Sequence, residues 1–280
     1  MVWFSGPGKR EDPPVKWLAV LAAATALAGA QQPKVADVVA RVDRYLSDYG
    51  SHLENIVAEE TYRQRAMAGP GLRLIRVLRS DYALTYVSQA WVGYRDTFAV
   101  DGQPVRDRDE RLKRLLASGA VAQAERIDRQ NAQYNLANDR LKRTVNVPTL
   151  ALEVLQPRYR RRFSVRRITG SAAPDRPGWI LEFRERARPT IARTEDGHNQ
   201  ASRIEAIVDP ATGEIHRTTM SWERTKGSIV VDYGRVDGVP VPVPLKMVER
   251  FTIGPGDEID SEAIYTNYRI FQTSGRLVGP

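Results

Sequence analysis

From residue 160 onward the sequence is a series of short segments in which apolar and polar residues alternate. Trp179, Leu181 and Phe183 fall on one face of such a segment. Turn signals separate the segments, as in Asp209-Pro210-Ala211-Thr212-Gly213. Short strands at this spacing, with no helices between them, predict a meandering antiparallel sheet. The expected strands cover residues 161–169, 179–186, 203–208, 214–224, 228–235, 241–252 and 259–271.

The first half of the chain combines helical and extended patterns. Apolar residues at three- and four-residue spacing predict a helix over residues 34–64. Alternating patterns predict strands at about 60–100, with a turn at Gly69-Pro70-Gly71. Leucines at helical spacing then predict a helical insert over residues 106–157.

A large antiparallel sheet with one apolar face must curl or be covered, and the two helical regions are the available cover. We therefore expect an α+β fold, in which a curled antiparallel sheet, or half-barrel, is covered by the N-terminal helix and the helical insert. The expected domain is a single one over residues 31–280, with the meander at 160–272.

Residues 1–30 have the layout of a secretory signal peptide. Lys9, Arg10 and Lys16 precede an apolar run that closes on Ala28-Gly29-Ala30. The run of about 14 residues is shorter than the roughly 20 that a spanning helix needs. The pattern predicts cleavage after Ala30 and a periplasmic or secreted protein. A buried N-terminal helix and a start further along the chain are the alternatives.

Composition limits the chemistry. The chain has no cysteine, which excludes disulfides, thiol catalysis and a cysteine-ligated metal. Its 42 lysines and arginines outnumber 34 acidic residues, so anionic partners are favoured. Export argues against nucleic acid as a partner.

No pattern predicts an active site. His52, His198 and His216 do not stand at metal-ligand spacing, so no metal is expected. No serine occurs in a G-x-S-x-G box. The paired acids, such as Glu59-Glu60, are adjacent residues whose side chains diverge. We therefore expect a non-catalytic protein without a cofactor.

The block Ile207-Val208-Asp209-Pro210-Ala211-Thr212-Gly213-Glu214-Ile215 resembles the bacterial lipoprotein-carrier superfamily of LolA/LolB-like half-barrels. The stretch Tyr265-Thr266-Asn267-Tyr268-Arg269-Ile270-Phe271 resembles the closing strand of these proteins. The resemblance implies a hydrophobic concavity that shields an acyl chain. The large insert at 106–157 departs from the family, and no arginine here can be matched to the carrier's functional arginine.

Two sets of residues are candidates for ligand contact. The aromatic residues of the β-rich half either line an apolar cavity or fill a core: Trp179, Phe183, Trp222, Tyr233, Tyr265 and Phe271. An arginine run either binds an anionic headgroup or is a solvated start of a strand: Arg160, Arg161 and Arg162.

The leading hypothesis is an exported, non-catalytic protein that binds a lipid or other amphiphile in an apolar concavity, with an anionic membrane surface as a further candidate partner. The alternative is a periplasmic interaction or envelope-scaffold module with a filled core and no ligand. The sequence does not identify the ligand, a protein partner or an oligomeric state.

Overall fold

The structure, a computed structural model, describes residues 32–52, 56–69, 71–87, 90–106, 131–137, 146–169, 177–194 and 196–270. The chain divides into a unit of residues Met1–Gln32 and a compact unit, Pro33–Pro280. The expected signal peptide therefore falls outside the described residues. Among the described helices, none is long and apolar enough to cross a membrane.

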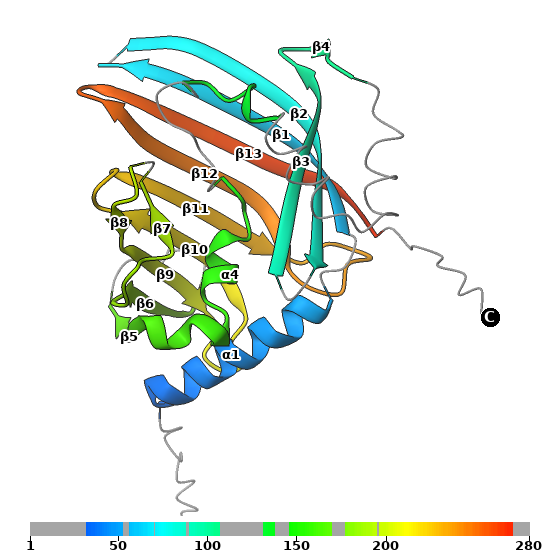
Figure 1. The fold of residues 1–280 in the computed structure, drawn as a ribbon. Coiled ribbons are helices and arrows are strands. Elements are labelled where there is room, and N and C mark those ends of the chain that lie inside the picture. The colour runs from blue at the N-terminus through cyan, green and yellow to red at the C-terminus, as the bar shows by residue number, and fades with distance from the viewer. Residues whose placement is uncertain are drawn as a thin grey trace, which may run out of the picture. The chain divides into compact units, whose positions relative to one another are not determined.

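The compact unit is built mainly from strands, with helices at one end of the sheet (Figure 1). The helical elements are α1 (Val35–Ser51), α4 (Leu150–Val154) and the 3-10 helix η1 (Pro157–Arg162). The strands are β1 (Ile56–Ala68), β2 (Gly71–Val87), β3 (Ala90–Val100), β4 (Gln103–Pro104), β5 (Phe163–Ile168), β6 (Trp179–Glu185), β7 (Ala192–Arg193), β8 (Asn199–Gln200), β9 (Ser202–Val208), β10 (Ile215–Trp222), β11 (Gly227–Gly234), β12 (Val243–Gly254) and β13 (Asp257–Ile270).

Eleven strands form one antiparallel sheet in the order β4-β3-β2-β1-β13-β12-β11-β10-β9-β6-β5. The last strand, β13, inserts between β1 and β12 and so joins the two halves of the chain. The sheet has two edge strands, β4 and β5, and does not close on itself. This open antiparallel sheet with its helical cover confirms the expected α+β class.

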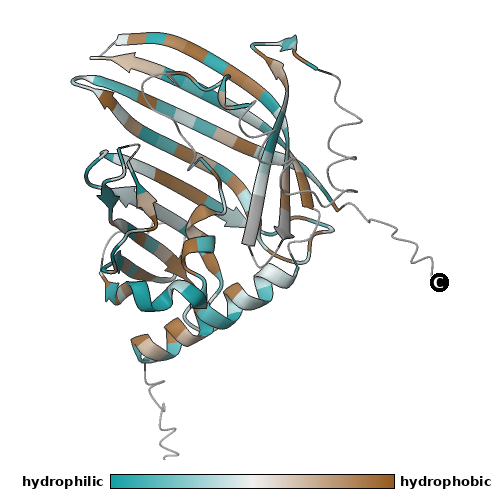
Figure 2. Ribbon diagram, in the orientation of Figure 1, coloured by the Kyte–Doolittle hydropathy of each residue, from teal (hydrophilic) through white to brown (hydrophobic). Residues whose placement is uncertain are grey.

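One face of the sheet, which we call the inner face, carries the core. Across four strands the register aligns Phe183, Ile204, Met220 and Ile229, and all four are buried. Apolar and polar residues alternate along the strands, as Figure 2 shows. Successive side chains point to opposite faces of a sheet, so this alternation sends the apolar set to one side.

Helix α1 packs on the inner face through one apolar stripe. Val38, Val42, Leu46 and Tyr49 lie at three- and four-residue spacing and are at most 1% exposed. They share one hydrophobic cluster with residues of β6 and β9–β13. The helix therefore contributes its apolar stripe to the core on the inner face.

The expected helix over 34–64 was too long. Helix α1 ends at Ser51, and residues 56–64 belong to β1. One face of β1 is buried at Ile56, Ala58, Glu60, Tyr62 and Gln64, and Val57 on the other face is buried as well. Two of the five residues on the first face are polar, so the period of two is hidden in the hydropathy pattern.

The expected helical insert is described only in part. Residues 107–130 and 138–145 lie outside the described residues. Within the insert, residues 131–137 and α4 are described, and Leu152 of α4 is fully buried. The strand expected from 161 begins at Phe163, because residues 157–162 form η1.

Candidate functional site

Five of the six predicted cavity aromatics lie together in the hydrophobic cluster of the inner face, and the sixth, Phe271, lies outside the described residues. None of the five described aromatics is more than 9% exposed. The five are Trp179, Phe183, Trp222, Tyr233 and Tyr265. The structure thus places these five of the six predicted aromatics in one packed cluster.

Three of these five aromatics form specific ring–ring contacts or hydrogen bonds. Trp222 stacks on Phe251 with a 6.4 Å centroid separation, and its indole N–H donates to Ser202 Oγ at 3.1 Å. The Tyr233 hydroxyl donates to the Pro148 carbonyl at 2.8 Å. Tyr265 meets the Tyr82 ring edge-on at 5.4 Å. These contacts are those of a filled core.

The three predicted headgroup arginines differ in their surroundings. Arg160 lies over the Phe183 ring at 4.9 Å and donates from Nε to Asp43 Oδ1 of α1 at 2.9 Å. Arg162 pairs with the buried Glu185 at 3.3 Å. Arg161 is exposed. Two of the three therefore hold protein segments together.

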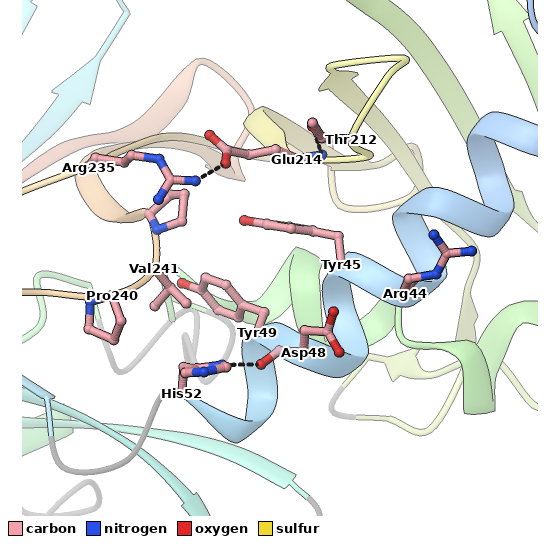
Figure 3. A pocket seen from close by; sticks show the side chains of 11 residues that line it. Arg44, Tyr45, Asp48, Tyr49, His52, Thr212, Glu214, Arg235, Pro240 and Val241 are labelled. Carbon is pink, nitrogen blue, oxygen red and sulfur yellow. Dashed lines mark hydrogen bonds and ion pairs between the residues drawn. The ribbon is translucent and has the colours of Figure 1, made fainter.

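A pocket of about 250 Å³ lies between α1, the β9–β10 turn and the β11–β12 connection (Figure 3). Its apolar wall comes from two tyrosines of α1 and a Pro-Val-Pro segment, and charged side chains form its rim. The lining residues are Arg44, Tyr45, Asp48, Tyr49, His52, Thr212, Glu214, Arg235, Pro240, Val241 and Pro242. None of the predicted aromatics lines this pocket.

The two tyrosines of the apolar wall lie one helical turn apart on α1. The rings of Tyr45 and Tyr49 lie 5.7 Å apart, and Figure 3 shows the Tyr45 ring reaching away from α1 toward Glu214 and Arg235. Burial raises the pKa of the Tyr45 phenol, and the negative charge of Glu214 raises this pKa further. Tyr45 is therefore a neutral hydroxyl donor.

The Tyr45 hydroxyl oxygen is buried and forms no hydrogen bond with any residue in the described part of the chain. The Ile215 backbone N–H lies close enough to oppose part of the rise of the Tyr45 pKa, but its geometry does not make a hydrogen bond to the Tyr45 oxygen. A buried polar group without a hydrogen bond costs about 1–3 kcal/mol. Because this oxygen is buried, a ligand in the pocket would remove that cost only if the Tyr45 hydroxyl turned toward it.

The turn between β9 and β10 places one wall of the pocket. Asp209 accepts hydrogen bonds from the Ala211 N–H at 2.7 Å and from the Thr212 hydroxyl at 3.0 Å. These bonds lower the pKa of Asp209, with the Ala211 N–H as the largest cause. The Arg41 guanidinium of α1 donates to the Pro210 carbonyl at 2.6 Å. The turn motif recognised in the sequence is thus also a docking point for α1.

The rim of the pocket is charged. Arg235 donates to Glu214. At the end of α1, His52 Nδ1 lies 2.8 Å from the Asp48 carbonyl oxygen. The sequence pattern does not predict this pocket. The signal that it offers is a pair of tyrosines, Tyr45 and Tyr49, among the apolar residues of α1. The rim residues come from turns far apart in the sequence, so no local pattern marks them.

Beyond β11, buried polar residues replace apolar ones in one row of the inner face. The row that is apolar through Ile229 continues as Glu249, Ser261 and Gln64, all at most 1% exposed. The Tyr62 hydroxyl donates to Glu249 Oε2 at 3.1 Å, and Gln64 Oε1 accepts the Leu136 N–H at 3.0 Å. Residues 131–137 are therefore anchored on the polar half.

The centre of this polar half is the ion pair of Glu60 and Arg95. Arg95 Nη2 donates to Glu60 Oε1 at 2.8 Å, and the second N–H, on Nε, donates to Glu60 Oε2. The guanidinium lies over the Tyr62 ring at 4.5 Å. The residue types were visible in the sequence, but the pairing of positions 35 residues apart was not.

Among the described residues, no group of three or more histidines or acids could hold a metal ion.

No protein-family model matches the sequence, and a sequence search of curated proteins finds no match. Solved structures with a similar chain trace include a protein domain described as outer membrane lipoprotein-sorting from Vibrio parahaemolyticus. It is 9% identical, with 83% of this chain and 92% of that chain covered and a TM-score of 0.43.

A LolA superfamily protein from Nitrosomonas europaea is 8% identical, with 82% and 94% covered and a TM-score of 0.38. A DUF1329 family protein from Desulfovibrio piger is 9% identical, with 84% and 93% covered and a TM-score of 0.36. These similar structures include the superfamily that the sequence resembles. The fold assignment itself rests on the strand order and register of this chain.

Proposed function

We propose that this protein is exported, is not an enzyme, and binds an amphiphile in the pocket beside α1. The observation that carries the proposal is the buried Tyr45 hydroxyl, which forms no hydrogen bond within the described chain, beside the apolar wall of that pocket. A ligand with a polar group next to a short apolar segment would complement both features once the buried Tyr45 hydroxyl turns toward the pocket. The charged rim would then contact an anionic or zwitterionic head.

The size of the pocket limits the ligand. At about 250 Å³ it is below the roughly 300–1,000 Å³ typical of ligand pockets. We therefore propose a small amphiphile, or one end of a larger lipid. Each buried methylene would contribute about 0.8 kcal/mol to binding. Arg160, Arg161 and Arg162 do not line this pocket. They remain proposed contacts for the headgroups of an anionic membrane surface, for which Arg160 and Arg162 would have to give up Asp43 and Glu185.

The test is calorimetric titration with a short-chain fatty acid and with a lysophospholipid. Tyr45→Phe should weaken binding about tenfold, because it removes one buried hydrogen bond of about 1.4 kcal/mol. It should leave the stability of the apo protein unchanged or higher, since the buried hydroxyl has no hydrogen bond to lose there.

Tyr159→Phe is the matched control, because Tyr159 lies on η1, outside the pocket. Absence of binding by the wild-type protein to either probe would contradict the proposal. Equal affinities for Tyr45→Phe, Tyr159→Phe and the wild type would contradict the assignment of the pocket.

The second candidate function is an interaction module with a filled core, and the packing of the five aromatics favours it. Their burial in one cluster needs no ligand to explain it. In this case the protein would bind neither probe, and its contacts with partners would lie on exposed strands or loops.

A further inference from the structure

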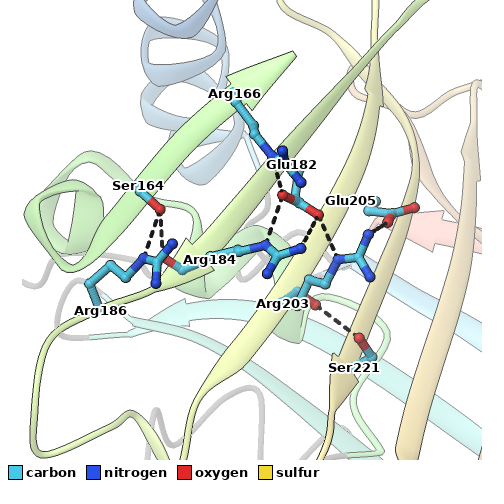
Figure 4. A network of polar contacts seen from close by, with 8 residues as sticks. All are labelled: Ser164, Arg166, Glu182, Arg184, Arg186, Arg203, Glu205 and Ser221. Carbon is cyan, nitrogen blue, oxygen red and sulfur yellow. Dashed lines mark hydrogen bonds and ion pairs between the residues drawn. The ribbon is translucent and has the colours of Figure 1, made fainter. Parts of the chain in front are cut away.

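The outer face of the sheet holds a carboxylate surrounded by three guanidiniums. Glu182 Oε1 accepts from Arg166 Nε at 2.6 Å and from Arg184 Nε at 2.8 Å, and Oε2 accepts from Arg203 Nε at 2.7 Å (Figure 4). The Glu182 side chain is 0% exposed, whereas those of Arg166, Arg184 and Arg203 are 62%, 40% and 42% exposed. The arginines thus cover the acid and face solvent themselves.

The strand register creates this cluster. Arg166 of β5 pairs with Glu182 of β6, which pairs with Glu205 of β9. In the next row on the same face, Arg184 pairs with Arg203. Neighbouring residues such as Phe183 belong to the opposite, inner face. Residues from three strands, including the edge strand β5, therefore converge at one place.

The cluster carries more positive than negative charge. Hydrogen bonds from Arg184 and then Arg166 lower the pKa of Glu182 to about 2, so this acid is ionised at neutral pH. Arg203 also pairs with Glu205 at 2.6 Å, and Arg186 Nε donates to Ser164 Oγ at 3.1 Å. Four guanidiniums against two carboxylates leave an excess of two positive charges.

One further acid lies nearby. Glu182 is the largest cause of the raised pKa of Arg184, and Glu223 raises this pKa as well. Glu223 is followed in the sequence by the exposed Arg224 and by Lys226, so the turn over residues 223–226 carries a net positive charge. The local excess of positive charge therefore stands when this turn is included.

Several guanidinium N–H groups remain available beside a hollow. A guanidinium has five N–H donors. In the described part of the chain, Arg166 uses only Nε for Glu182, and Arg186 uses only Nε for Ser164. A hollow of about 360 Å³ lies over these groups, lined by Ser164, Val165, Arg166, Glu182, Arg184 and Arg186.

We propose that this hollow binds a phosphate group. Guanidinium forks match phosphate oxygens in geometry, and a phosphate monoester dianion matches the excess charge of the cluster. Glu182 serves as a positioning residue that holds Arg166, Arg184 and Arg203 against their mutual repulsion. Arginines on an edge strand also discourage strand addition, but that role does not require convergence on one carboxylate. The site lies apart from the pocket beside α1 and stands independently of the amphiphile proposal.

The test uses the full chain with inorganic phosphate in calorimetry, and with phosphatidylcholine vesicles that contain or lack phosphatidic acid in a flotation assay. Arg186→Gln is the diagnostic variant, because Arg186 does not contact Glu182 and the network around that acid stays complete. We expect it to weaken binding about tenfold with an unchanged melting temperature. Arg193→Gln on β7 is the control, since it removes the same charge from an exposed position outside the hollow.

Saturable binding of inorganic phosphate that Arg186→Gln weakens and Arg193→Gln does not would support a site for a free phosphorylated ligand. The same pattern with phosphatidic acid vesicles alone would support a lipid headgroup as its source. Binding of neither probe would overturn the proposal. An equal loss of affinity in both variants would overturn it too, because a nonspecific attraction of anions to positive charge would be weakened equally by Arg186→Gln and Arg193→Gln.

Discussion

Gly213, in the turn between β9 and β10, lies directly against the backbone of Arg41 in α1. A Cβ atom at Gly213 would come within 2.5 Å of the Arg41 carbonyl oxygen. The Arg41 side chain reaches back to the Pro210 carbonyl in the same turn. Helix and turn therefore fix each other, and the pocket beside α1 depends on their close approach.

Substitution of this glycine should be costly for two reasons. Gly213 has a φ of +82°, which side chains rarely adopt, and Gly213→Ala would also place a methyl group against α1. Gly197→Ala is the matched control, because Gly197 has a φ of +81° in open space. We expect the control to lose about 1–2 kcal/mol of unfolding free energy and Gly213→Ala to lose about 1–3 kcal/mol more. Urea denaturation checks this, and equal losses would mean that the turn does not support α1 tightly.

Trp222→Ala distinguishes a filled core from a cavity wall. Trp222 is 4% exposed and stacks on Phe251, so the filled core predicts a loss of about 3–5 kcal/mol of unfolding free energy. Leu72→Ala, at a side chain that is 53% exposed, should change stability by no more than about 0.5 kcal/mol. A stable Trp222→Ala protein that no longer binds amphiphile would instead place Trp222 in a ligand cavity.

The buried pair of Glu60 and Arg95 should respond differently to single and double substitution. Arg95→Met leaves the Glu60 carboxylate buried without its guanidinium, and we expect a loss of about 3–5 kcal/mol. Adding Glu60→Leu removes that uncompensated charge and should recover part of the loss. Thermal and urea unfolding of the three variants, with the Glu60→Leu single variant included, measures the coupling. A double variant whose loss equals the sum of the single losses would contradict the pairing.

Stability should fall in acid because of Glu182. The pKa of Glu182 is lowered from 4.5 to about 2 in the folded protein, so the unfolded chain takes up this proton first. The stabilisation is present above the unfolded pKa, near 4.5, and is lost as the pH falls toward 2. Because the partner arginines face solvent, screening reduces the effect to about 1 kcal/mol.

Urea denaturation between pH 6 and pH 2 tests this assignment. Glu182→Gln should be less stable than the wild type at pH 6, and the difference should shrink on acidification as the wild-type carboxylate takes up its proton. A difference that stays constant over this range would show that Glu182 is not held ionised by its arginines.

The sequence was most predictive where one face of a strand is uniformly apolar. The expected segment 179–186 matches β6 at Trp179–Glu185, and 228–235 matches β11 at Gly227–Gly234. Such strands show their burial directly in the alternation of hydropathy. Gly69-Pro70-Gly71 likewise coincides with the end of β1 and the start of β2.

Prediction failed where polar residues face inward. In β1, Glu60 and Gln64 are buried, and their compensation comes from Arg95 and from the Leu136 backbone. These partners are distant in the sequence, so the segment resembled the continuation of a helix. The candidate pocket could not be predicted for the same reason, because its lining residues Tyr45 and Arg235 come together only after α1 packs on the sheet.

Native mass spectrometry, with lipid extraction, on the protein purified without detergent tests most directly whether an amphiphile binds beside α1. Binding of an amphiphile beside α1 predicts a stoichiometric co-purified lipid, or a one-to-one complex after challenge with fatty acid or lysophospholipid, that Tyr45→Phe diminishes. A clean mass of the protein alone, unchanged after both challenges, would contradict the account and favour the interaction module with a filled core.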